Sequence, residues 1–246
     1  LIRGAAKSNK YAKRTLQLAL FVHVCHLVVS FIASGRVELD LRLGLSATAL
    51  ILGVVYLFAA WLHARLTPLG AFVVPVVLLL YAGSELVRDN VISANAVQRD
   101  ALLTFHIAVN MLGLVAFVLA FTVSVAYLIQ ETMLRRKTLG GLFQRLPDLQ
   151  VLDSLVLFLV TLGFPLLTLG IATGAMRSYR MHGTLFVLSY GQVFALFAWV
   201  CFAAVLVLRF AAGWRGRRAA IGTMIGFVCS MLVLLGYMLR GIGLSP

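Results

Sequence analysis

Seven long apolar runs separated by short polar joints account for most of the chain. They cover residues 15–34, 44–62, 69–84, 101–129, 151–176, 184–208 and 219–239. Each is near the ~20 residues that an α-helix needs to cross the hydrocarbon core of a bilayer. The pattern predicts an all-α fold, a polytopic transmembrane bundle of about seven spanning helices. We allow for one further helix upstream, because the chain begins at Leu1 rather than at a methionine.

The fourth run has one side that differs from the rest. Steps of three and four residues from His106 meet small or polar side chains, at Asn110, Gly113, Ala120 and Ser124. A helix of this kind is expected to pack that stripe against protein and to show its other faces to lipid. Histidine and asparagine are costly in hydrocarbon unless a partner satisfies them, so His106 and Asn110 are the first candidates for chemistry.

The composition is that of a membrane protein, and it changes how the high net positive charge is interpreted. It is 62% hydrophobic with a mean hydropathy of +1.02. A net charge of +13 would suggest nucleic acid in a soluble domain. Here the basic residues lie at the ends of apolar runs, where they set topology and meet anionic headgroups. We therefore expect membrane lipid and other membrane subunits as partners, and no nucleic acid. Residues 1–14 form a basic segment, and residues 15–246 are expected to be a single transmembrane domain.

The basic residues also predict an orientation. With seven spans and the N-terminus in the cytoplasm, fourteen of the 21 Lys and Arg residues lie inside and seven outside. That asymmetry favours a multi-pass protein of the cell inner membrane with a cytoplasmic N-terminus. His106 then enters the membrane from the outer face.

Two further patterns indicate packing or anchoring. Gly170 and Gly174 are spaced four residues apart in the fifth run, which allows close approach of another helix and is first a packing signal. Trp214 stands beside Arg215, Arg217 and Arg218. This group is typical of a membrane anchor, and a cytoplasmic partner site is the second interpretation.

Several stretches carry a resemblance to a known family. They are Leu103-Thr104-Phe105-His106-Ile107 with Gly113 and Ala116-Phe117, Tyr127-Leu128-Ile129-Gln130-Glu131, Leu146-Pro147-Asp148-Leu149-Gln150, and Gly213-Trp214-Arg215-Gly216-Arg217-Arg218. With these the chain resembles the cytochrome c assembly family, integral membrane haem-handling proteins that include CcsA, CcmC and HemX-like proteins. Residues 70–75 look like the HemX-like branch. The resemblance implies haem b as cofactor and a haem-handling protein without an enzymatic active site.

The resemblance also implies residue roles. In the family the histidine at the start of this helix is an external axial ligand to haem, and His106 matches it. Arg177 and His182 stand where the family has signature tryptophans. Val207 stands at its membrane-embedded histidine, and the ending Gly241-Ile242-Gly243-Leu244-Ser245 lacks its second external histidine. Only one of the three family haem histidines is therefore present. The expected function is to bind or present haem at the outer side of the bundle, with the iron on His106.

The remaining candidates each have two interpretations. His182 is either the opposite iron ligand or a solvated loop histidine. Arg177 and Arg180 either pair with haem propionates or extend their head groups to the interface. For the whole chain, the alternative is a structural or regulatory membrane subunit that keeps the scaffold and has lost haem chemistry.

Overall fold

The structure is a computed structural model that describes residues 2–34, 41–86, 101–137, 140, 143–185 and 190–241, without the side chains of residues 2–10, 34, 41, 182, 190 and 237–241. Within these ranges every regular element is helical. The elements are α1 (Ile2–Ser34), α2 (Leu41–Leu62), the 3-10 helix η1 (Ala64–Leu69), α3 (Gly70–Leu86), α5 (Ala101–Arg135), α6 (Leu149–His182), α7 (Tyr190–Ala211) and α8 (Arg217–Gly241).

Seven described segments are long and apolar enough to cross a membrane. They are Tyr11–Ala33, Arg42–Leu62, Ala64–Leu86, Ala101–Arg135, Leu149–Met181, Gly191–Ala211 and Arg217–Gly236. The chain is therefore a multi-pass membrane protein, and the predicted fold class is confirmed. Because α1 begins at Ile2, the basic segment 1–14 is largely part of the first helix. The domain division expected at residue 14 stays a prediction.

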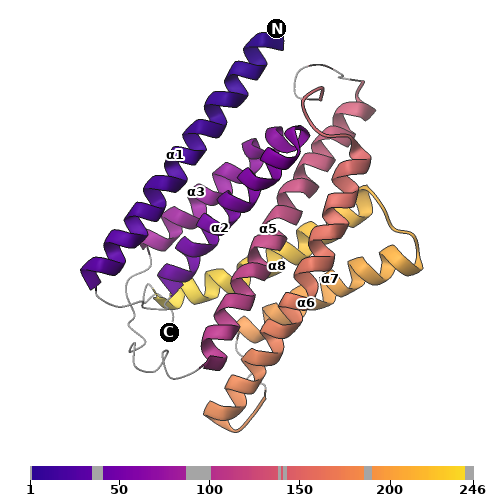
Figure 1. Ribbon diagram of the computed structural model, residues 1–246. Coiled ribbons are helices and arrows are strands. Elements are labelled where there is room, and N and C mark those ends of the chain that lie inside the picture. Colours follow the sequence, from indigo (N-terminus) through magenta and orange to yellow (C-terminus); the bar gives the residue numbers. More distant parts are fainter. Residues whose placement is uncertain are drawn as a thin grey trace.

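The long helix α5 lies in the middle of the bundle (Figure 1). It packs against α2 and α3 on one side and against α6 and α8 on the other, while α7 pairs with α8 and α6. We call the end where α5 begins and α6 finishes the His106 end. The opposite end, where α5 finishes and α6 begins, is the Glu131 end, and the turn between α7 and α8 lies there too.

The expectation that only one stripe of α5 packs against protein is wrong. Gly113 and Ser124 are buried as predicted, but so are Val115 and Val118, which belong to other faces. The reason is that neighbouring helices cover α5 on several sides. Apolar side chains look the same whether they face lipid or another helix, because lipid tails are as apolar as leucine.

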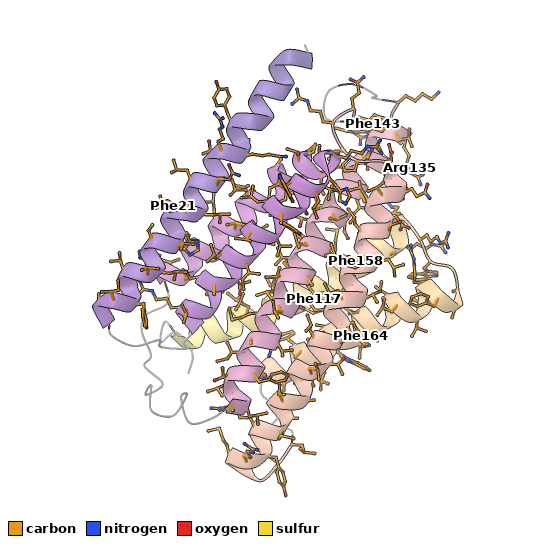
Figure 2. The ribbon with its side chains drawn as sticks, viewed as in Figure 1. Phe21, Phe117, Arg135, Phe143, Phe158 and Phe164 are labelled. Atoms are coloured by element: carbon orange, nitrogen blue, oxygen red, sulfur yellow. The ribbon has the colours of Figure 1, made fainter. Side chains whose placement is uncertain are left out.

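An aromatic pair joins four helices at the level of the bundle centre. The rings of Phe117 on α5 and Phe202 on α7 stack 3.9 Å apart at 8°, and Figure 2 shows Phe117 in the middle of the molecule. Gly163 on α6 lies against the first ring and Gly226 on α8 against the second. The two stacked rings of α5 and α7 therefore lie between a glycine of α6 and a glycine of α8, and this contact brings the four helices together.

Candidate functional site

The candidate site is built around His106 in the second turn of α5. The side chain is half-buried, and its Nδ1 lies 2.9 Å from Oγ1 of Thr173 on α6. The Thr173 hydroxyl donates to the backbone oxygen of Leu169 at 2.7 Å, so its oxygen accepts from the imidazole. The proton of the neutral ring is then on Nδ1. This tautomer leaves Nε2 with the free lone pair that metal ligation needs.

Asn110 lies one turn further along α5 and packs against the same ring. Its Nδ2 donates to the backbone oxygen of His106 at 2.7 Å. The same nitrogen is 3.3 Å from Nδ1 and 3.2 Å from Nε2. A donor aimed along one lone pair would lie much farther from the other nitrogen, because the two point to nearly opposite sides of the ring. Asn110 therefore lies over the face of the imidazole and does not bond along the lone pair of Nε2.

The two spaced glycines of α6 receive these side chains. A Cβ at Gly174 would lie 3.1 Å from Cε1 of His106, and one at Gly170 would lie 2.5 Å from Oδ1 of Asn110. Real Cβ contacts are rarely this short, so both positions depend on the absence of a side chain. The predicted packing signal is thus correct, and its partner is the polar stripe of α5.

Not every predicted site residue joins this group. Arg177 lies one helical turn beyond Thr173 and is half-buried, and Arg180 is exposed. His182 is the last residue of α6, and its side chain lies outside the described residues. Thr173 was missed by sequence reasoning. Its signal was a polar residue between Gly170 and Gly174, on a helix already expected to approach another closely.

His106 offers one nitrogen ligand. Among the residues that the structure describes, no group of three or more His, Cys, Asp or Glu side chains could hold a metal ion. His23, on α1, places Nε2 2.8 Å from Oγ of Ser46 and packs against Tyr81, so it is a satisfied packing residue. Val207, which the resemblance to the family places at the embedded histidine, is 61% exposed on the surface of α7.

A second polar cluster lies at the Glu131 end. Asp153 on α6 accepts two hydrogen bonds from Arg209 on α7, at 2.8 and 2.7 Å, and one from the backbone of Gly216 at 2.7 Å. Glu131 on α5 pairs with Arg135 at 2.8 Å and with Arg217 of α8 at 3.3 Å. These contacts fix the turn between α7 and α8 onto the ends of α5 and α6.

Comparison with known proteins gives a family match over nearly the whole chain. The family model described as "Cytochrome C assembly protein" matches residues 11–245. A cytochrome c biogenesis protein CcsA of Synechococcus sp. (strain WH7803) is 32% identical over 176 residues, 59% of this chain and 55% of the relative. That of Trichormus variabilis is 41% identical over 101 residues, 41% of this chain and 29% of the relative.

A third CcsA, from Prochlorococcus marinus subsp. pastoris, is 27% identical over 263 aligned residues, which cover 97% of this chain and 83% of the relative. The matches to the first two relatives span about half or less of those proteins' length. No solved structure matches the chain. These relatives are all named CcsA, so the expected placement on the HemX-like branch is not confirmed.

Proposed function

Because the chain belongs to the cytochrome c assembly protein family, we propose that it handles haem in cytochrome c biogenesis, binding or presenting it at the His106 end of the bundle. The observation that carries this proposal is the hydrogen bond from His106 Nδ1 to Thr173. It holds the ring in the tautomer whose Nε2 can ligate iron. A hydrogen-bond acceptor on the other ring nitrogen orients a histidine ligand before the metal arrives.

The residues at the His106 end would have different roles in binding haem. His106 would bind the haem iron, and Asn110 and Gly174, which pack against the imidazole, would keep its ring in place. Arg177 and Arg180, at the end of α6, provide the charge that propionates need. A second ligand to the iron would come from His182 or from another membrane subunit, or that position would hold no protein ligand. When bound, haem would be the cargo that is passed on in cytochrome c biogenesis. The chain itself acts as a binding protein rather than an enzyme.

The haem expected here is haem b, held without covalent attachment. The three cysteines lie one each in α1, α7 and α8 and form no CxxCH sequence. We further propose that the protein lies in the cell inner membrane with its N-terminus cytoplasmic, since the distribution of basic residues favours that side. The His106 end then faces outward.

One observation favours the alternative of a scaffold or regulatory subunit. The side chain of Val207 is apolar and largely exposed on the outside of the bundle. An aliphatic residue there supplies no ligand where the family has its embedded histidine. A scaffold subunit would keep the helix packing and would bind no haem.

The absorption spectrum of the purified full chain, expressed with excess haem, separates the two functions. We expect a Soret band that His106→Ala removes or shifts. His63→Ala is the matched control, because His63 is exposed at the Glu131 end, and it should leave the band unchanged. Thr173→Val keeps the ligand and removes its acceptor, and should weaken haem binding by about 10–100-fold.

Two results would count against the proposal. A haem-free wild type under these conditions would favour the scaffold subunit. A haem spectrum that survives His106→Ala unchanged would show that another residue holds the iron. Thermal unfolding of each variant without haem checks that a lost band does not reflect a lost fold.

A further inference from the structure

A cleft of about 660 Å³ opens at the Glu131 end, and the proposed function does not use it. Its walls come from the last turns of α5, from the first turn of α6 and from residues 212–218 between α7 and α8. The spans of α5 and α7 finish, and those of α6 and α8 begin, at this level. The cleft therefore lies where the bundle leaves the hydrocarbon core.

The charges in this cleft do not balance. Four arginines line it, at positions 135, 215, 217 and 218, with two carboxylates, Glu131 and Asp153. Asp153 is already bound by Arg209, and Glu131 by Arg135 and Arg217. Arg215 and Arg218 are exposed, and neither forms an ion pair among the described residues. Arg215 interacts electrostatically with the Asp153 carboxylate, but neither guanidinium group donates a hydrogen bond among the described residues, so the donors of both can bind an anion.

The segment that carries these two arginines is held in place before any ligand arrives. The backbone of Trp214 donates to the oxygen of Leu208 at 3.1 Å, and that of Gly216 donates to Asp153 at 2.7 Å. Gly213 and Gly216 both have positive φ, of 64° and 63°, which a residue with a side chain rarely adopts. A fixed loop loses little conformational entropy on binding, which favours affinity.

Apolar side chains flank the same segment. Phe210, in the last turn of α7, is 73% exposed, and Ile221, in the second turn of α8, is also exposed. Trp214 packs under Arg218, whose guanidinium carbon lies 5.8 Å from the centre of the indole ring. Tryptophan beside basic residues is characteristic of the headgroup layer. A ligand with a charged head and apolar chains fits this arrangement better than a soluble ion.

We propose that this cleft binds the phosphate group of an anionic membrane phospholipid through Arg215 and Arg218. The planar guanidinium groups offer paired N–H donors that match phosphate oxygens. The acyl chains then run along the exposed sides of α7 and α8. This site lies at the opposite end of the bundle from His106, so it does not depend on haem.

Native mass spectrometry of the full chain in detergent tests the site. Phosphatidylglycerol and phosphatidylcholine with identical acyl chains are titrated against wild type, Arg215→Gln/Arg218→Gln and Arg136→Gln/Lys137→Gln. The last variant is the matched control, because it removes two exposed charges at the same end that do not line the cleft. We expect wild type and control to prefer phosphatidylglycerol. The cleft variant should bind it about tenfold more weakly or worse, since charge-assisted hydrogen bonds are lost.

Three results would overturn the proposal. Equal weakening in both variants would mean that only the bulk positive charge attracts the lipid. Equal affinity of wild type for the two lipids would show that the net negative charge of the lipid does not contribute to binding. Displacement of phosphatidylglycerol by millimolar inorganic phosphate alone would identify a soluble phosphate, not a lipid, as the ligand. Single variants Arg215→Gln and Arg218→Gln, each expected to show a smaller loss, keep the test valid should the double variant unfold.

Discussion

Adding one methyl group at Gly163 should destabilise the bundle measurably. A Cβ there would lie 2.7 Å from Cε1 and 3.0 Å from Cζ of Phe117. The ring cannot retreat, because its other face stacks on Phe202, and Phe202 in turn meets Gly226 at 3.0 Å from where a Cβ would stand. Both phenylalanines are essentially fully buried. Overpacking of this kind costs about 1–3 kcal/mol. Alanine gains about 1 kcal/mol in helix propensity at the same position, so Gly163→Ala should lose about 0–2 kcal/mol net and should be about 1–3 kcal/mol less stable than the same substitution where the methyl meets nothing.

The control is the same substitution at Gly236 on α8, where a Cβ would meet nothing within 4 Å. Alanine is the better helix former by about 1 kcal/mol, so Gly236→Ala should be neutral or stabilising. The measurement is the free energy of unfolding in mixed micelles titrated with denaturing detergent. Adding Phe117→Leu to Gly163→Ala makes room for the methyl and should recover part of the loss. Equal stability of the two alanine variants would refute the close packing of α5 between α6 and α7.

Two further predictions concern the Glu131 end and the orientation. Arg209→Gln removes the guanidinium group that donates two hydrogen bonds to the largely buried carboxylate of Asp153, and it should cost about 3 kcal/mol. Adding Asp153→Asn should restore much of the thermal stability, and no recovery would show that the charge is not the cause. In a cysteine-free background, Thr184→Cys should react with an impermeant reagent in intact cells and Ala212→Cys only after the membrane is opened; the reverse result would invert the proposed topology.

The spans could be predicted from sequence because a bilayer sets a minimum apolar length. Their ends could not. The run expected to finish at residue 129 continues as helix to Arg135, and the run expected over 151–176 is helical from Leu149 to His182. Outside the hydrocarbon the helical hydrogen bonds persist while the side chains become polar. Hydropathy therefore predicts where the chain crosses the membrane, but it does not predict where a helix begins or ends.

The site was half visible in the sequence. His106 and Asn110 stood out because polar side chains in an apolar run need partners. Gly170 and Gly174 stood out as a place of close approach. What spacing alone could not supply was the register between α5 and α6, which brings Gly174 to His106 and places Thr173 on Nδ1. The register depends on how the side chains of both helices fit together, and that fit is known only from the packed structure.

The length of α5 determines how deep in the membrane its histidine lies. His106 and Glu131 are 25 residues apart on one continuous helix, a distance of about 37 Å at 1.5 Å per residue. The hydrocarbon core is about 30 Å thick, and a typical tilt of ~20° shortens the helix only slightly. With the ion-paired Glu131 at one boundary, His106 stands in the headgroup layer of the opposite leaflet. Under the proposed function, a haem already in that leaflet would reach His106 by lateral diffusion, with its charged propionates remaining in the headgroup layer.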